Sequence, residues 1–319
     1  MTDPDKIRLG ISSCLLGAQV RYDGGHKLDR YLRDVLGEYV EYIPVCPEVE
    51  VGLPVPRESL RLVRNDHEQV RLVFTRSGED MTERMEKWAR ERVGQLEQEQ
   101  LDGFVFKSKS PSSGMERVKL YDRNGVPRNV GVGVFARIFM EHFPLLPVEE
   151  EGRLNDPKLR ENFISAIFTL KRWRSLLRTG QTLGNLVDFH SRHKLLILAH
   201  SEKIYRDMGR LVATGRQQPT EQLFSQYQTL LMQALQLRTT VKKHINVLQH
   251  ILGYFKRDLS ADEKREALEL IDGYRNGHLP LIVPLTLLNH FIRKYQQPYL
   301  QQQVYLNPHP KELKLLNHV

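Results

Sequence analysis

The first half of the chain alternates short apolar runs with segments of helical periodicity. Apolar runs at residues 7–12, 40–45, 70–75 and 104–106 predict strands. Residues 27–38 and 81–98 repeat apolar positions at helical spacing and predict helices. Strands and helices that alternate in this way form a parallel sheet with right-handed crossovers. We therefore expect a Rossmann-like α/β domain over residues 1–150.

The second half of the chain has a different pattern. Residues 144–157 are rich in Pro, Glu and Gly, and every apolar pattern beyond them is helical. The amphipathic segments predict helices over residues 162–177, 186–212, 221–237, 241–255, 261–274 and 285–295. We expect a basic linker helix in residues 151–185 and an all-α domain, which we assign to RNA binding below, in residues 186–319.

Three loops of the predicted sheet hold the most reactive side chains. Cys14 and Cys46, the two cysteines of the chain, each follow a strand directly, and so does the Ser-, Lys- and Pro-rich loop that ends at Gly114. The carboxyl ends of parallel strands lie along one edge of a sheet, where α/β folds bind ligands. We therefore expect the three loops to meet there and to bind a polar or anionic ligand.

Charge is unevenly distributed along the chain. The formal net charge is +8, but residues 151–319 hold 25 basic and 14 acidic side chains (+11), whereas residues 1–150 hold 22 and 25 (−3). A basic half is typical of a nucleic-acid binder, and a basic surface that only confers solubility is an equally open alternative. No apolar run is long enough for a bilayer, no apolar leader begins the chain, and two cysteines make no disulfide framework. We expect a cytoplasmic protein without a membrane partner.

Residues 129–136 contain Gly-x-Gly-x-x-Ala, a pattern found in dinucleotide-binding turns. The pattern lies late in the domain rather than at the first βα turn, so we do not assign a nucleotide cofactor to it. We expect a tight turn into a helix over residues 134–142, whose free amide groups can hold an anion.

The residues alone leave several interpretations of the cysteines open. Isolated cysteines are mostly packing residues. A redox pair or a persulfide-carrying nucleophile is an alternative, because basic neighbours lower a thiol pKa. An iron–sulfur cluster normally needs three or four thiolates, and zinc needs further ligands, of which His26 is the nearest histidine in sequence.

Motifs in both halves of the chain resemble known families. The first half resembles the TudS family of thiouracil desulfidases in the motifs Ser13-Cys-Leu-Leu-Gly17, Arg21-Tyr-Asp-Gly24, Cys46-Pro-Glu48, Gly52-Leu-Pro, Pro56-Arg57 and Lys107-Ser-Lys-Ser-Pro-Ser-Ser-Gly114. The helical half, with Asp188-Phe-His-Ser-Arg-His-Lys194 and Ala199-His-Ser-Glu-Lys203, resembles the domain fused to TudS in the RudS tRNA 4-thiouridine desulfidases. Both halves occur here in the same order as in that fusion.

The resemblance implies a 4Fe-4S cluster held by three cysteines. One iron is then free to take the sulfur of a thiolated base as a Lewis acid while water supplies oxygen. Cys14 and Cys46 match two of the ligands, but the third ligand position is Ser113. A serine oxygen binds iron far less well than a thiolate does. The loop is otherwise intact, so we interpret the chain as an inactive Cys-to-Ser variant, engineered rather than natural, whose cluster is impaired or absent.

The same resemblance suggests roles for other residues of these loops. Glu48 is the candidate general base for water, and Ser110 is the candidate to position water or base. Lys107 and Lys109 are candidates to hold phosphate, and Arg57 either does so or pairs with Glu48. The structural alternatives are a capping carboxylate for Glu48 and ordinary turn chemistry for Ser110.

A tRNA partner requires a basic surface, because phosphate contacts dominate nucleic-acid affinity. The candidate contacts are basic residues of the helical half: Lys171, Arg172, Arg174, Arg178, Arg192 and Lys194, with Lys242 and Lys243 behind them. Trp173 either stacks on a base or packs between the domains. His190, His193 and His200 can share a helix face, but no cysteine or clear carboxylate joins them, so we do not assign a metal there.

The predicted function is therefore removal of sulfur from 4-thiouridine in tRNA by a 4Fe-4S desulfidase that Ser113 impairs. Desulfidation of free thiouracil or thio-UMP is a variant of this function. A cluster-free thiol sulfurtransferase that uses Cys14 or Cys46, and a tRNA-binding protein without chemistry, are the two rivals. The sequence indicates no protein partner.

Overall fold

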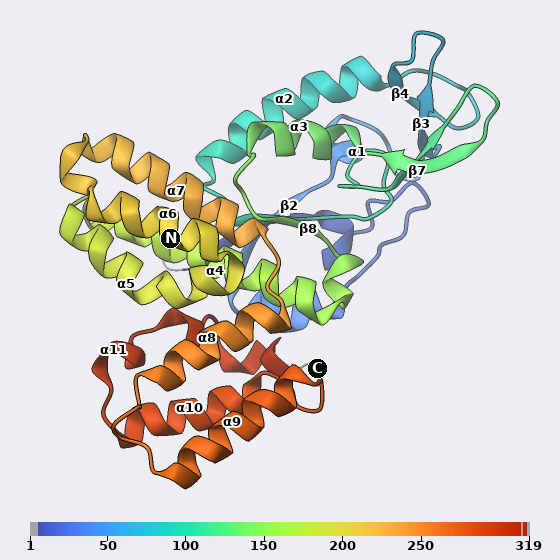
Figure 1. Ribbon diagram of the computed structural model, residues 1–319. Helices are drawn as coiled ribbons and strands as arrows, with labels where there is room; N and C mark the ends of the chain where they lie inside the picture. The colour runs from blue at the N-terminus through green and yellow to red at the C-terminus, as the bar shows by residue number, and fades with distance from the viewer. Residues whose placement is uncertain (1–5, 314, 318–319) are drawn as a thin grey trace. The chain divides into compact units, whose positions relative to one another are not determined.

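The computed structural model of the protein describes residues 6–313 and 315–317. The chain divides into two compact units, residues 1–155 and 156–319 (Figure 1). The first unit is an α/β domain with a parallel sheet and the second is dominated by helices, so the predicted fold class is confirmed. The expectation about an apolar leader concerns residues 1–5, which lie outside the described residues.

Four parallel strands form the central sheet of the first unit. In spatial order they are β2 (Val40–Val45), β1 (Ile7–Ser12), β5 (Gly103–Phe106) and β8 (Val148–Glu150). β1 and β5 are buried along nearly their whole length, as expected for strands covered on both faces. The strand order reverses between β1 and β5, and such a switch point is where open α/β sheets bind ligands.

A second, mixed sheet lies in the same unit. Its strands in spatial order are β4 (Val70–Phe74), β3 (Leu60–Arg64), β6 (Val118–Tyr121) and β7 (Pro127–Gly131). The prediction that residues 70–75 join the parallel sheet is wrong, because β4 pairs antiparallel with β3. Apolar alternation identifies a strand but does not determine its partner. Here the hairpin is closed by Asn65, whose side chain accepts from the amides of His67 and Gln69.

Helices α1 (Pro47–Glu50), α2 (Thr82–Gln98) and α3 (Val134–His142) complete the first unit. α2 and α3 pack side by side in Figure 1. Phe135 and Phe139 of α3 pack on Phe104 and Phe106 of β5, and the ring centroids of Phe104 and Phe139 are 4.7 Å apart. This buried aromatic cluster fixes β5, and with it the start of the loop that follows.

The predicted helix over residues 27–38 is wrong. The structure has a wide π turn at Tyr31–Val35 and a 3-10 turn at Leu36–Glu38. The Asp29 carboxylate accepts from the amide of Leu32, and the Tyr42 hydroxyl donates to the Leu32 carbonyl at 2.5 Å. A segment this short has little helical stability of its own, so local contacts decide its turns.

The second unit is built from helices joined by short loops. The helices are α4 (Pro157–Thr179), α5 (Leu183–His200), α6 (Glu202–Ala213), α7 (Thr220–Gln236), α8 (Val241–Gly253), α9 (Ala261–Arg275), α10 (Ile282–Lys294) and α11 (Pro298–Gln301). The single helix predicted over residues 186–212 is wrong. Ser201 lies between α5 and α6, and its hydroxyl caps α6 by accepting from the amide of Ile204. None of the helices in the described part of the chain is both long enough and apolar enough to cross a membrane.

Trp173 of α4 lies at the centre of the packing among α4, α5 and α7. The side chain is fully buried, its ring stacks on Tyr227 at 5.1 Å, and its Nε1 donates to Gln228 at 2.9 Å. Phe189 and Phe224 complete the cluster. Both predictions for Trp173 are wrong, because its aromatic partners all belong to the helical unit and no face of its ring is open to a base.

Candidate active site at the carboxyl edge of the parallel sheet

The carboxyl ends of β1, β2 and β5 open onto one pocket of about 290 Å³. The predicted site residues that line it come from the three loops after these strands: Cys14, Cys46, Glu48, Lys107, Lys109, Ser110 and Ser113, together with Arg57. The pocket lies at the switch point of the sheet, between the ends of β1 and β5. The structure therefore brings together the loops that topology alone places at this edge.

Cys14 is the second residue after β1, and Cys46 is the first residue after β2. Cys14 lies in a 3-10 turn, Ser13–Leu16, and Cys46 is the N-cap residue of α1. Both thiols are free. Burial raises the pKa of Cys14 to about 11, against the opposing charge of Lys107, and burial also raises the pKa of Cys46. The expectation that basic neighbours lower the thiol pKa is wrong, because desolvation outweighs the nearby positive charge.

Glu48 is held at both carboxylate oxygens. Its Oε2 accepts from Arg57 Nε at 2.9 Å and Nη2 at 2.6 Å, and its Oε1 accepts from Ser112 Oγ at 2.9 Å. The Arg57 side chain is only 3% exposed and also donates to the carbonyls of Val20 and Pro54. Of the two roles considered for Arg57, the structure shows the ion pair with Glu48. The carboxylate is thus fixed in orientation at the wall of the pocket.

Hydroxyl groups organise the loop that follows β5. Ser110 Oγ accepts from the amides of Ser112 at 3.3 Å and Ser113 at 3.1 Å, and it lies 3.0 Å from Ser112 Oγ. These are the hydrogen bonds that a serine commonly makes in a turn, and they link Ser110 through Ser112 to Glu48. Sequence reasoning missed Ser112 as the residue that holds Glu48. The only signal for it was its place in a loop with more serines than a turn requires.

The start of α3 supports this loop from behind. The amides of Val134 and Phe135 donate to the carbonyls of Pro111 and Ser112 at 3.2 and 2.9 Å. A Cβ atom on Gly133 would lie 2.6 Å from the carbonyl carbon and oxygen of Ser112, so only glycine fits. The prediction that these amides are free to hold an anion is wrong, because the loop carbonyls occupy them. Gly133 of the Gly-x-Gly pattern is therefore needed for close packing against the loop that lines the pocket.

The two lysines of the loop differ in their surroundings. Lys107 is mostly buried, and its ammonium group pairs with Glu151 and donates to the carbonyl and hydroxyl of Ser108 at 3.0 Å. Lys109 is exposed at the wall of the pocket, in a left-handed backbone conformation with φ of 60°. Lys109 is therefore the better placed of the two to meet a phosphate.

The basic residues of the helical unit also differ in their surroundings. Arg172 is largely buried and donates to the Pro308 carbonyl at 2.6 Å, and burial lowers its pKa to about 10. Lys243 donates to the carbonyls of His200 and Arg238. Both cations donate to backbone carbonyls of the helical unit. This environment does not support their assignment as RNA contacts.

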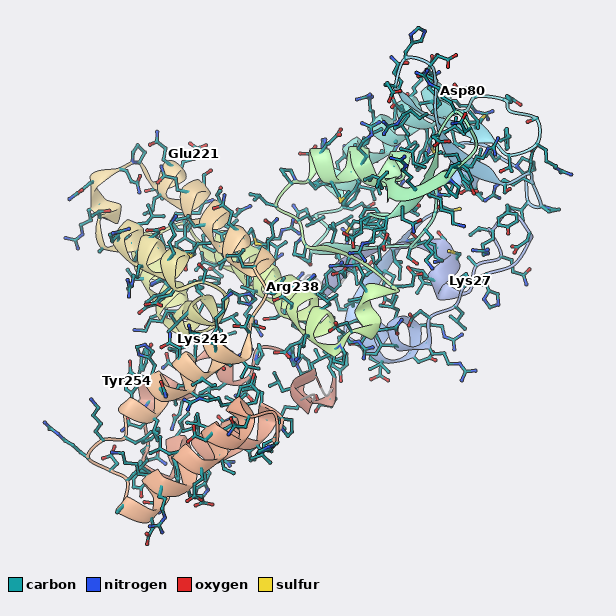
Figure 2. The ribbon with its side chains drawn as sticks, turned by 45° about the vertical axis from the view of Figure 1, so that its right-hand side comes forward. Lys27, Asp80, Glu221, Arg238, Lys242 and Tyr254 are labelled. Carbon is teal, nitrogen blue, oxygen red and sulfur yellow. The ribbon has the colours of Figure 1, made fainter. Side chains whose placement is uncertain are left out.

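The other basic candidates lie on α4, α5 and α8. Lys171, Arg174 and Arg178 are on α4, and Arg178 is exposed. Arg192 is half-exposed and pairs with Asp188 at 3.0 Å, and Lys194 Nζ lies 4.6 Å from the centre of the Tyr299 ring. Lys242 is exposed near the start of α8 (Figure 2). Arg178, Arg192 and Lys242 therefore remain accessible to a phosphate backbone.

The three histidines of α5 are components of the helical core. Their Nδ1 atoms lie within hydrogen-bond distance of the Tyr227 hydroxyl (His190), the Phe189 carbonyl (His193) and the Leu237 carbonyl (His200). Burial lowers the pKa values of His190, His193 and His200 to about 4, 3 and 4. At neutral pH these rings are uncharged, and their contacts explain their presence structurally.

Fold and site together define an α/β domain with a cysteine-lined pocket at the switch point of its sheet, followed by a helical domain. Residues 9–151 match the family described as 2-thiouracil desulfurase, and residues 194–310 match a family described as a protein of unknown function, DUF1722. The chain is 34% identical over 163 residues to the uncharacterized protein YbgA of Escherichia coli strain K12, and the match covers 51% of this chain and 96% of YbgA. It is 31% identical over 108 residues to the uncharacterized protein YbbK of Bacillus subtilis strain 168, covering 33% of this chain and 71% of YbbK.

The chain therefore belongs to the 2-thiouracil desulfurase family through residues 9–151, and its second unit carries a YbgA-like DUF1722 domain. Among solved structures it is similar to the 4Fe-4S-dependent thiouracil desulfidase TudS. That match has 31% sequence identity and a TM-score of 0.39, and it covers 47% of this chain and 95% of the TudS chain.

Proposed function

We propose that this protein is a form of a tRNA 4-thiouridine desulfidase, which converts 4-thiouridine to uridine. The observation that carries the proposal is the pocket in which Cys14, Cys46, Glu48 and Ser113 meet within a desulfurase domain. In the overall reaction water supplies the oxygen, a C4–O bond forms, the C4–S bond breaks and sulfur leaves as hydrogen sulfide. No net oxidation or reduction occurs.

The charge of the second half supports tRNA rather than a free base as substrate. Residues 151–319 carry a balance of +11, and Arg178, Arg192 and Lys242 are accessible on the helical unit. Cations of this kind bind a phosphate backbone, whereas a free thiouracil needs no such surface. The proposed partner is therefore tRNA, with the thiolated base in the pocket of the α/β unit.

The donor atoms of the pocket test whether a 4Fe-4S cluster fits this chain. The sequence has two cysteines, and Ser113 supplies a hydroxyl to the pocket that Cys14 and Cys46 line. Among the described residues, no three His, Cys, Asp or Glu side chains are grouped so that they could hold a metal ion. Iron–sulfur clusters need thiolates, and a hard serine oxygen is a poor replacement. The residues present do not fit the cluster, so we propose that this chain is an inactive Cys-to-Ser form.

The chain's own side chains retain the parts that bind substrate and handle protons. Glu48, oriented by Arg57 and Ser112, is the proposed base that takes a proton from water in the pocket. Lys109 is the proposed contact for a substrate phosphate. The rival thiol sulfurtransferase is disfavoured, because such enzymes work through a thiolate, and burial raises the pKa of both Cys14 and Cys46.

The test restores a third thiolate. Anaerobic reconstitution of Ser113→Cys is expected to load about four iron and four sulfide ions per chain, while the present chain loads none. Only the loaded variant should then remove the absorbance of the thiolated base from tRNA that contains 4-thiouridine. Ser108→Cys, which places a third thiol elsewhere in the same loop, is the matched control and should not assemble a cluster.

Other outcomes select the rivals. If neither form holds iron yet both bind the tRNA, the protein is a tRNA-binding protein without chemistry. If Ser113→Cys desulfidates free thio-UMP as fast as tRNA, and Arg178→Gln with Arg192→Gln leaves both rates unchanged, the substrate is the free nucleotide.

A further inference from the structure

A second pocket, larger than the candidate active site, lies within the helical unit. It has a volume of about 470 Å³ and is lined by residues of α10, by Gln301 of α11 and by the chain that follows α11. Its apolar lining consists of Ile282, Ile292, Leu306, Pro308, Leu315 and Leu316. Pockets of a few hundred Å³ with mixed apolar and polar walls are typical of small-molecule sites. The pocket shares no residue with the candidate active site.

Two uncompensated positive charges line this pocket. Arg293 of α10 and Lys311 are exposed lining residues, and neither forms an ion pair with a described residue. The adjacent Lys294, by contrast, pairs with Glu263 at 2.7 Å. No Asp or Glu is among the described residues that line the pocket. The pocket therefore favours an anionic ligand.

A buried histidine also lines this pocket. His309 lines the pocket and is 7% exposed, and its Nδ1 lies 3.2 Å from the Pro310 carbonyl. A carbonyl only accepts, so Nδ1 carries the hydrogen, and Nε2 is a buried acceptor without a hydrogen-bond partner.

The remaining polar groups narrow the class of ligand. Asn289, Gln301 and Asn307 line the pocket with side-chain amides, which supply both donors and acceptors. These groups match the polar edge of a nucleobase, which a fatty acid or another simple carboxylate does not offer. Apolar walls, amides and two cations without an ion-pair partner among the described residues are together the requirements of a base joined to a phosphate.

We propose that this pocket of the helical unit binds a nucleoside monophosphate, with the phosphate at Arg293 and Lys311 and the base against the apolar wall and the side-chain amides. The site goes beyond the proposed desulfidase function, because it belongs to the other unit and uses none of the residues that handle sulfur. Two ligands contain a base joined to a phosphate in this way: a free nucleotide and the phosphorylated end of an RNA chain.

Isothermal titration of the full chain with UMP tests the proposal. UMP is expected to bind at least about tenfold more tightly than either uridine or inorganic phosphate, since each of those lacks one half of the contacts. The double variant Arg293→Gln and Lys311→Gln should weaken UMP binding at least about tenfold, because it removes the charge-assisted contacts to phosphate. The matched control is Arg265→Gln on α9, where the arginine is exposed and pairs with Asp262, and it should leave binding unchanged.

The remaining comparisons separate this proposal from the active site and identify the source. UMP binding that is lost in Lys109→Gln but kept in the double variant would place the nucleotide in the first pocket and overturn the proposal. Inorganic phosphate binding as tightly as UMP would reduce the pocket to a simple anion site, which also overturns it. Competition by a 5′-phosphorylated oligouridylate as strong as by UMP identifies an RNA end as the source, and weak competition identifies a free nucleotide. Failure of UMP to bind overturns this proposal and leaves the cluster experiment on Ser113→Cys unaffected.

Discussion

The two units of this protein place the candidate functional side chains singled out from sequence in opposite environments. In the α/β unit the polar residues singled out from sequence follow strands, and the structure gathers them around one pocket. In the helical unit Trp173 and the three histidines of α5 lie on helices, and the structure buries Trp173, His193 and His200 and half-buries His190. A loop at the end of a strand points side chains toward ligands, whereas a helix face at core periodicity points them inward.

The comparison also shows how the pocket is maintained. Glu48 is fixed by Arg57 and Ser112, and the serine loop is supported by Gly133 and the first amides of α3. Much of the α/β unit thus serves to hold a few loop atoms in place. In the helical unit the corresponding polar contacts stabilise the core itself.

The largest expected effect is that of Trp173→Ala on the helical unit. Removing a fully buried indole should lower the free energy of unfolding by about 3–5 kcal/mol. Tyr254→Ala, at an aromatic side chain 44% exposed in the same unit, should cost less than about 1 kcal/mol. Urea unfolding measures both. A Trp173→Ala protein of unchanged stability that loses only tRNA affinity would restore the base-stacking role and blur the contrast between the units.

A smaller effect is expected where the α/β unit supports its pocket. Gly133→Ala forces a Cβ atom against the Ser112 carbonyl and should lower the free energy of unfolding by about 1–3 kcal/mol. Gly94→Ala, in the middle of α2 with open space around its Cβ, should instead raise it by about 0.5–1 kcal/mol. Two glycines of one unit are thus expected to respond with opposite signs. Equal responses in thermal unfolding would show that the contact with Ser112 does not constrain the loop.

The smallest effect is an acid sensitivity that belongs to the helical unit. Burial lowers the pKa of His200 from 6.5 to about 4, so the folded protein keeps the ring neutral while the unfolded chain takes up a proton. The stability that this histidine contributes is complete above pH 6.5 and is lost as the pH falls toward 4. Between pH 7 and pH 5 the loss should be about 1–2 kcal/mol.

His200→Gln can still donate to the Leu237 carbonyl but does not titrate in this range, so it should reduce the acid loss by that amount. His67→Gln, in an exposed hairpin loop of the α/β unit, controls for the removal of one histidine. Urea unfolding at pH 7 and pH 5 makes the comparison. An unchanged pH dependence in His200→Gln would show that its ring is not the group that titrates.

Local sequence patterns predicted some elements of the fold and missed others. Apolar runs located β1, β2 and β5 of the parallel sheet but missed the three-residue strand β8. Polar caps such as Ser260 mark helix starts that periodicity had already located. Periodicity did not reveal that Ser201 divides α5 from α6, because the apolar stripe continues through the cap. The second sheet was also missed, since its hairpins β3–β4 and β6–β7 are joined by the β3–β6 pair between segments distant in sequence.

Sequence by itself determined the two-unit organisation, the strand-end positions of Cys14 and Cys46 and the presence of Ser113 at the third loop. These features depend on periodicity, chain order and residue identity, which are local properties. Only the tertiary structure decided that Ser112 holds Glu48, that the amides of α3 support the loop rather than an anion, and that both thiols are desolvated. Those outcomes depend on distances between segments far apart in the chain and on burial, and neither quantity exists before the chain has folded.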